Sequence, residues 1–326
     1  MKINLVIIIL IIAVIACNSH AEEDQLLLQP PYSSLTDSIR QQPKNADLYY
    51  IRGILLYQNS QKSYAEKDLK KAWQLQPTEE YALSIVTILI DKNRDSAILF
   101  IEQALKVIPQ SVSLNISLAR GYQQKAELQK ALAVCDQVLS YYPNSLDALI
   151  LKAEILKQQG KDIEGLAVLE KAYSYAPFDR DLCYNLAFEY AEAENQKVLA
   201  LTDSLIRVDT IESHAEPYYF KAVYYDNTGN VAQALNFYDQ AIQHDYNYLD
   251  AYIDKGRLLY REKKYQPALE TFQLTTRITP TFASGYYWTA KCQEAMNNKE
   301  EAKLNYQRAY GLDKTLMEAK EAADKL

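Results

Sequence analysis

Five prolines recur at nearly constant intervals along the first half of this chain, and their spacing constrains the fold more than any other feature. Pro43, Pro77, Pro109, Pro143 and Pro177 are separated by 34, 32, 34 and 34 residues. A fixed period of this length is typical of repeat proteins, in which each unit packs mainly against its neighbours. The sequence therefore predicts an array of similar supersecondary units.

Small and large residues return at fixed places between the prolines. In residues 146–179 the small residues are Ala153, Gly165 and Ala172, and the large apolar residues are Leu149, Leu156 and Leu169. Small side chains let two helices approach closely, while large side chains fill the space to the next unit. We therefore interpret these positions as packing residues without a chemical role.

The period and these positions resemble the tetratricopeptide repeat (TPR) family over residues 46–316. The resemblance implies an all-α fold, a right-handed superhelical TPR solenoid of about eight helix-turn-helix repeats. The expected repeats are residues 46–79, 80–111, 112–145, 146–179, 180–212, 215–248, 249–282 and 283–316. Residues 35–45 are expected to form a partial leading helix, and residues 317–326 a C-terminal capping helix.

Two of the expected repeats depart from the period. Residues 80–111 are two residues short, and the shortening falls at the turn between the two helices, around residues 91–95. Residues 180–212 lack the proline that ends most of the other units, and two extra residues follow them. We expect irregular local geometry in both places within the same architecture.

The N-terminus has a different character. An apolar run from Leu5 to Ala16 follows Lys2, which suits the core of a signal peptide over residues 1–16. The run ends in VIAC, which resembles the lipobox of bacterial lipoproteins and implies that Cys17 is lipidated. Residues 17–34 are then expected to be a tether, and the protein to be exported and lipid-anchored in the bacterial cell envelope, at the outer membrane. An ordinary signal peptide and an uncleaved anchor remain the alternatives.

The TPR resemblance implies a concave groove lined by the first helix of each repeat. The groove positions recur every three or four residues and so share one helical face. Tyrosine is abundant at them, with 27 tyrosines in the chain against 7 phenylalanines, and it suits an interface because it buries a large ring and keeps a hydroxyl for hydrogen bonding. The residues expected to contact a partner are Tyr50, Tyr57, Arg120, Tyr184, Phe188, Tyr219, Arg257, Tyr260, Tyr287 and Lys291.

Several classes of function are disfavoured by the composition. The net charge of −7 and the absence of a Lys/Arg cluster interleaved with aromatic residues argue against nucleic acid as a partner. The three histidines and the remaining cysteines, Cys135, Cys183 and Cys292, are too scattered for a metal site, and the cysteines are expected to be buried without disulfides. No motif for phosphate binding, nucleophilic catalysis or a cofactor is found, so no enzyme activity is expected.

Three functions remain open. The first is a membrane-anchored, non-catalytic adaptor that binds a protein or peptide in its groove, in envelope assembly, secretion or motility machinery. The second is a glycan-binding envelope lipoprotein, because aromatic rings can pack against sugars. The third is a spacer or self-associating scaffold. The carboxylate clamp of chaperone-binding TPR domains is not matched, since Tyr50 and Ile54 stand where that motif has Lys and Asn.

Overall fold

The computed structural model describes residues 25–208 and 214–326, and every regular element within these ranges is an α-helix. The signal peptide predicted at residues 1–16 and the lipidation predicted at Cys17 lie outside the described residues. None of the described helices is long and apolar enough to cross a membrane.

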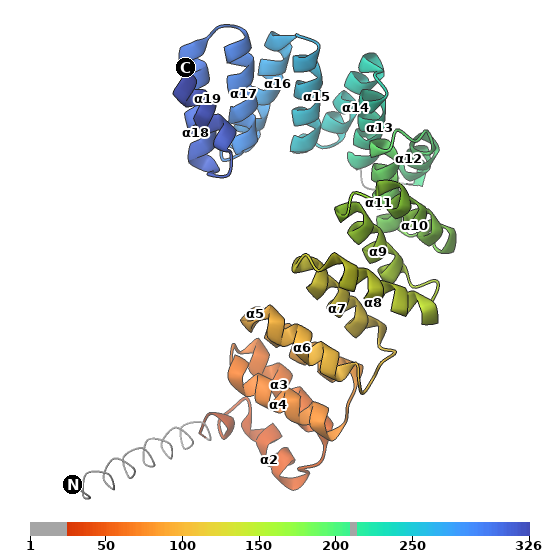
Figure 1. Ribbon diagram of the computed structural model, residues 1–326. Coiled ribbons are helices and arrows are strands. Elements are labelled where there is room, and N and C mark those ends of the chain that lie inside the picture. Colours follow the sequence, from red (N-terminus) through yellow and green to blue (C-terminus); the bar gives the residue numbers. More distant parts are fainter. Residues whose placement is uncertain (1–24, 209–213) are drawn as a thin grey trace, which may run out of the picture. The chain divides into compact units, whose positions relative to one another are not determined.

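Consecutive helices form pairs along the chain (Figure 1). The first and second helices of each pair are α3 (Ala46–Gln58) and α4 (Lys62–Leu75), α5 (Glu79–Lys92) and α6 (Arg94–Ala104), α7 (Val112–Gln124) and α8 (Leu128–Tyr141), α9 (Leu146–Gln158) and α10 (Asp162–Tyr175), α11 (Arg180–Glu192) and α12 (Lys197–Val208), α13 (Glu216–Asn227) and α14 (Val231–His244), α15 (Leu249–Arg261) and α16 (Tyr265–Ile278), and α17 (Ala283–Ala295) and α18 (Lys299–Leu312). A single helix precedes the pairs, α2 (Ser33–Gln41), and another follows them, α19 (Met317–Lys325).

Four of the regularly spaced prolines lie two residues after a helix end, and Pro109 lies five residues after the end of α6. Pro77, for example, follows the end of α4 at Leu75, and Pro177 follows the end of α10 at Tyr175. Proline has no backbone N–H and clashes with the preceding turn, so it cannot continue a helix. The period therefore marks where one pair ends and the next begins.

The chain divides into two compact units, residues 1–168 and residues 169–326, and the division falls inside α10. In unit 1, Ala65, Ala72, Ala119 and Ala131 are fully buried between helices. The equivalent small residues of unit 2 are also fully buried, namely Ala222, Ala234, Ala241, Ala268, Ala290, Ala302 and Ala309. Within each unit the small residues thus form the close helix contacts that the sequence pattern predicts.

One close contact of this kind is in unit 2, at Gly256 of α15. A Cβ atom at this position would lie 2.4 Å from Cε1 of Phe272 in α16. Phe272 is itself fully buried and stacks on Trp288 of α17, with the ring centroids 5.6 Å apart. Only glycine leaves room for the phenylalanine ring at this approach.

The short repeat at residues 80–111 is shortened at its inter-helix turn, as predicted. Asn93 alone separates α5 from α6, whereas three residues separate α3 from α4. The Asn93 side chain accepts hydrogen bonds from the backbone N–H groups of Asp95 and Ser96, at 2.8 and 3.2 Å. One asparagine therefore ends the first helix and caps the second, which compensates for the two missing residues.

The prediction of a tether over residues 17–34 is wrong for its C-terminal part. Leu26 and Leu27 pack against the apolar cluster of the first pair, and Tyr32 is buried. The Thr36 hydroxyl donates to the carbonyl of Leu27 at 2.7 Å. The physical reason is that the end of an array exposes apolar surface, and this segment, together with α2, covers it.

Candidate partner-binding surface

The predicted groove residues of unit 1 contact the following repeat instead of standing alone. The ring of Tyr50 in α3 packs on Tyr81 in α5, with centroids 4.8 Å apart, and its hydroxyl donates to Glu80 at 3.0 Å. Tyr57 donates to Asp91 at 3.4 Å. These hydroxyls therefore join α3 to α5.

Arg120 makes a similar contact further along unit 1. Its guanidinium in α7 lies 3.7 Å from the Glu154 carboxylate in α9. Both side chains are largely exposed, so this ion pair contributes at most about 1 kcal/mol to stability. Arg120 is thus accessible to a partner at small cost.

In unit 2 the contacts between first helices form a continuous chain that begins at α13 and α15. Tyr219 in α13 donates to Asp254 in α15 at 2.7 Å, and Arg257 forms an ion pair with the same aspartate at 3.1 Å. In the opposite direction, Arg261 of α15 forms an ion pair with Asp226 of α13. Each helix therefore supplies an acceptor to the other.

The chain continues from α15 through α17 to α19. Tyr260 and Arg257 of α15 both contact Trp288 of α17, at 5.9 Å between ring centroids and 5.6 Å from the guanidinium carbon to the ring centre. Tyr287 donates to Glu318 of α19 at 3.0 Å, and the Lys291 ammonium lies 6.0 Å from the centre of the Tyr287 ring. We call the side chains of these contacts between α13, α15, α17 and α19 the aromatic–carboxylate face.

Burial changes the acidity of the groups on this face. Desolvation, followed by the charge of Asp254, raises the pKa of Tyr219 well above its ordinary value. Desolvation also raises the pKa of Asp226, although the neighbouring Arg261 partly opposes it. It raises the pKa of Asp250 as well, and the charge of Asp254 adds to the increase. The face therefore holds carboxylates that would gain from a nearby cation.

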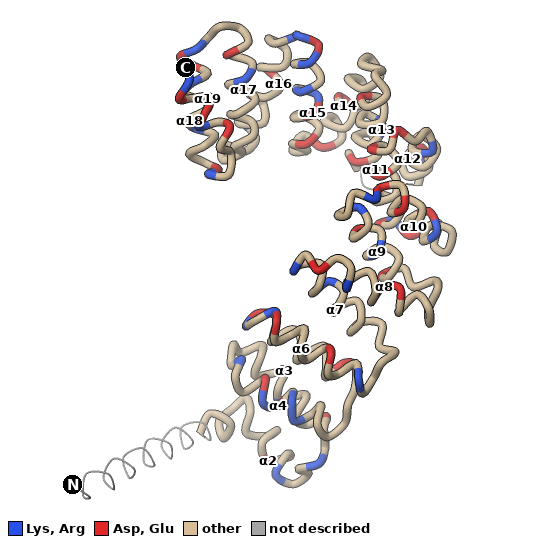
Figure 2. The backbone as a smooth tube through the Cα atoms, viewed as in Figure 1, with Lys and Arg blue, Asp and Glu red and all other residues tan. Residues whose placement is uncertain are grey.

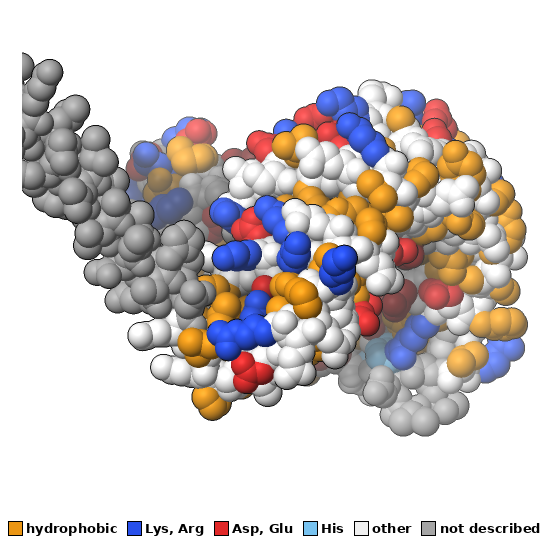
Figure 3. All heavy atoms as spheres, turned by 90° about the horizontal axis from the view of Figure 1, so that it is seen from below, with side chains coloured by type: hydrophobic (Ala, Val, Ile, Leu, Met, Phe, Trp, Pro, Cys, Tyr) orange, Lys and Arg blue, Asp and Glu red, His pale blue; other side chains and the backbone are white. Residues whose placement is uncertain are grey.

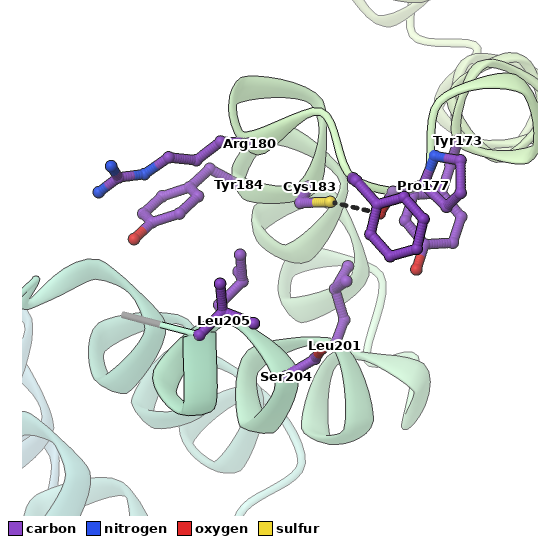
Figure 4. Close-up of a pocket in the computed structure, with 10 residues that line it drawn as sticks. Tyr173, Pro177, Arg180, Cys183, Tyr184, Leu201, Ser204 and Leu205 are labelled. Atoms are coloured by element: carbon purple, nitrogen blue, oxygen red, sulfur yellow. Dashed lines mark hydrogen bonds between the residues drawn. The ribbon is translucent and has the colours of Figure 1, made fainter. Parts of the chain in front are cut away.

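A pocket of about 450 Å³ lies in unit 2 between the end of α10, the start of α11 and the C-terminal half of α12 (Figure 4). Tyr184 and Arg180 of α11 line one side, and Leu201 and Leu205 of α12 lie opposite them. Phe178 in the turn before α11 also lines the pocket, and its side chain is 96% exposed. Tyr184 and Phe188 also pack against Phe220 of α13, at 6.2 and 5.8 Å between ring centroids.

Comparisons with known proteins agree with this architecture. Residues 221–281 match the family model described as tetratricopeptide repeat. A tetratricopeptide repeat protein from Parabacteroides merdae superposes with a TM-score of 0.61 at 18% identity, over 75% of this chain and 97% of that one. The chain has the fold of a TPR solenoid.

A second solved structure supports the same fold. The Cut9–Hcn1 hetero-tetramer of the APC/C matches with a TM-score of 0.51 at 12% identity, over 88% of this chain and 57% of that one. No sequence among the curated proteins matches. TPR proteins are generally non-catalytic scaffolds that bind proteins or peptides.

Of the predicted groove residues, those of α13, α15 and α17 come together in this TPR solenoid, and those of α11 lie at the pocket and against α13. Tyr50, Tyr57 and Arg120 form separate contacts in unit 1. Contact of any of them with a partner stays a prediction. The sequence pattern missed two sets of residues: the carboxylates that accept from the tyrosines, and the second-helix residues of the pocket. The missing proline of residues 180–212 indicated irregular geometry in this repeat but did not predict a pocket.

Cys135, Cys183 and Cys292 are free and buried, as predicted. Desolvation raises the pKa of the Cys135 and Cys292 thiols to about 12, and it also raises that of Cys183. In the described part of the chain no group of His, Cys, Asp and Glu side chains could hold a metal ion.

Proposed function

We propose that the protein is a lipid-anchored, non-catalytic adaptor of the cell envelope that holds a protein or peptide partner on the aromatic–carboxylate face of unit 2. The observation that carries the proposal is the continuity of this face, which runs through the first helices α13, α15 and α17 to the terminal helix α19 without a break. Tyr, Trp and Arg are the residues that contribute most energy to protein interfaces.

The electrostatics of the face favour a partner segment that carries a basic residue. Asp250 is exposed at the start of α15, forms no ion pair with any of the residues described, and has a raised pKa because of desolvation and the neighbouring Asp254. A Lys or Arg of the partner would relieve this repulsion, and the half-buried rings of Tyr260 and Tyr287 would pack against its apolar neighbours.

The anchor is the part of the proposal that depends on the sequence alone. Its support is the position of Cys17 at the end of the apolar run, and a diacylated cysteine gives stable membrane attachment. Mass spectrometry of the protein extracted from native membranes tests it directly. A mature N-terminal cysteine with the added mass of the acyl chains is expected, and cleavage elsewhere without added mass would refute the anchor.

The glycan-binding alternative gains no separate support from the tyrosines. A sugar needs an open ring face, but Phe272 stacks on the ring of Trp288 and Arg257 lies over it. The Tyr218 ring is likewise stacked on His244, with centroids 4.2 Å apart. We therefore do not propose it as a second function.

Cross-linked co-purification from native membranes tests the adaptor role. The variant Asp250→Asn/Arg257→Gln removes the negative charge of Asp250, four residues before Asp254 on α15, and the positive charge of Arg257 on the face, while sparing the buried tyrosines. The control Glu262→Gln/Lys263→Gln makes the same charge changes at the exposed α15–α16 turn. We expect the first variant to lose a discrete protein that wild type and control both recover. Recovery of the same proteins by all three would refute this binding face.

A further inference from the structure

Unit 1 carries a positively charged rim that the adaptor role does not use. Lys67, Lys70 and Lys71 of α4 surround a depression of about 460 Å³, whose floor includes Arg52 and Asp68. Lys and Arg lie along α4 and near the turn after α2 in Figure 2, and they gather on the face of unit 1 turned to the viewer in Figure 3. We call Lys44, Lys67, Lys70 and Lys71 the basic rim.

The floor of the depression is electrically balanced, whereas the rim is not. Arg52 donates twice to the Asp68 carboxylate, at 2.6 and 2.8 Å, and both side chains are buried. Lys70 is paired with Glu66 at 2.7 Å. Lys67 and Lys71 form no ion pair with any described residue, although both are exposed.

The placement of Lys67 and Lys71 is unfavourable for the helix itself. They lie four residues apart, so their ammonium groups project from the same face of α4 and repel each other. Overall the chain is acidic, with a net charge of −7, which makes unpaired lysines on one face unusual. Neither charge is used by an ion pair among the described residues.

Lys44 belongs to the same surface. It follows Pro43 in the turn between α2 and α3, and the carbonyl of Pro43 accepts a hydrogen bond from the Tyr49 hydroxyl at 3.3 Å. Tyr49 in turn lines the depression. This contact holds the turn, and with it Lys44, beside the rim of α4.

The N-terminal segment reaches the same place through a chain of hydrogen bonds. Arg52 donates to the Thr36 hydroxyl at 2.9 Å, and that hydroxyl donates to the carbonyl of Leu27 at 2.7 Å. The described chain therefore starts next to the floor of the depression. About eight residues separate Gln25 from Cys17, and a fully extended chain of that length spans at most ~28 Å.

We propose that the basic rim of unit 1 docks on the anionic phospholipid headgroups of the membrane that carries the anchor. The proposal rests on the lipid anchor of the proposed function, because the short link to Cys17 keeps unit 1 at the bilayer surface. Clusters of lysine next to a membrane attachment point bind anionic lipid. Because the acyl chains of the anchor already hold the chain at the membrane, the rim would act on the orientation of unit 1. The rim then fixes which side of unit 1 faces the lipid.

Vesicle flotation with the chain from residue 18 onwards tests the rim without the acyl chains. Vesicles of phosphatidylglycerol mixed with phosphatidylcholine are compared with phosphatidylcholine alone, at low and at high salt. The rim variant is Lys44→Gln/Lys67→Gln/Lys71→Gln. The control variant Lys263→Gln/Lys264→Gln/Lys299→Gln removes the same charge from exposed positions of unit 2. Circular dichroism checks that both variants remain helical.

Wild type and control are expected to float with the anionic vesicles at low salt and to be released at high salt. Each lysine near an anionic surface changes the partition coefficient about fivefold, so the rim variant is expected to bind about a hundredfold more weakly. No binding of wild type to anionic vesicles, or an equal loss in the control, would overturn the docking proposal. Mass spectrometry of Cys17 tests the anchor separately, so a failure of the anchor can be distinguished from a failure of the docking surface.

Discussion

Replacing Gly256 with alanine tests the close approach of α15 to α16 with a single methyl group. The new Cβ would lie 2.4, 2.5 and 2.9 Å from Cε1, Cζ and Cδ1 of Phe272. All three atoms belong to one rigid ring, which is fully buried and stacked on Trp288. The ring cannot move aside without disturbing the next helix pair, so the helices themselves must separate.

Two opposing effects set the magnitude. Alanine is more favourable than glycine inside a helix by about 1 kcal/mol. Overpacking of a well-filled core costs about 1–3 kcal/mol, and three contacts on one immobile ring place Gly256→Ala at the upper end. We expect a net loss of about 2 kcal/mol in the free energy of unfolding of unit 2, or a fall of about 4–8 °C in its Tm.

Tryptophan fluorescence during urea unfolding measures this loss locally. The chain has two tryptophans, Trp73 in unit 1 and Trp288 beside Phe272 in unit 2. In a Trp73→Phe background the remaining signal comes from Trp288 alone. Repeat arrays need not unfold in one step, so a local probe is more informative than total helicity.

Gly311→Ala is the matched control. Gly311 lies in α18, and a Cβ atom there would meet nothing within 4 Å. This substitution is expected to leave unfolding unchanged or to stabilise the chain by up to about 1 kcal/mol. If Gly256→Ala is as stable as Gly311→Ala, then Phe272 does not require a glycine and the packing argument is refuted.

Three further predictions follow from buried polar groups. Arg52→Met leaves Asp68 buried without its partner and is expected to lower the free energy of unfolding in urea by about 3–5 kcal/mol. The double variant Arg52→Met/Asp68→Leu is expected to recover most of this loss, and a single variant as stable as the double would contradict the argument. Desolvation raises the pKa of Asp250 above its ordinary 3.8, so the folded state binds that proton more tightly than the unfolded state and stability falls as pH rises through that range. In a pH series of urea midpoints, Asp250→Asn should flatten this slope and be more stable than wild type at neutral pH. The thiols of Cys135 and Cys292, with pKa values of about 12, should react with a thiol reagent only after unfolding, and rapid reaction of the folded chain would show that they are accessible.

The helix pairs could be predicted because their signals repeat. Pro77 and Pro177 mark helix ends through a property of the residue itself, and Ala234 and Ala302 stand at a position that is small in most of the repeats. The short turn at Asn93 was also visible, because a deletion shifts the period at a definite place. These features follow from local rules that apply to each repeat alike.

The candidate site was only partly predictable because its key residues do not repeat. The groove position of Tyr219 follows from the period, but its acceptor Asp254 belongs to no recurring pattern. From the sequence, the tyrosine hydroxyls were expected to be available to a partner, but in the structure carboxylates of the same chain accept their hydrogen bonds. Leu26 and Tyr32 were assigned to a tether because they precede the repeats, although their apolar side chains cover the end of the array. Likewise, the net charge of −7 describes the whole chain and gave no indication that lysines of α4 lie together on one surface.

The hydrogen bond from Tyr219 to Asp254 also bears on how such an array can change through evolution. Asp254 is the sixth residue of its repeat, and the sixth residues of the other repeats are Ile51, Ile85, Ser117, Leu151, Asn185, Phe220 and Trp288. If recombination removed residues 249–282, Tyr219 would face the indole of Trp288 in place of a carboxylate, and its desolvated hydroxyl would lose its acceptor. The helices are similar enough to be exchanged, but their side chains specify which repeat must follow which. Loss of residues 249–282 would therefore cost the array a specific hydrogen bond as well as a helix pair.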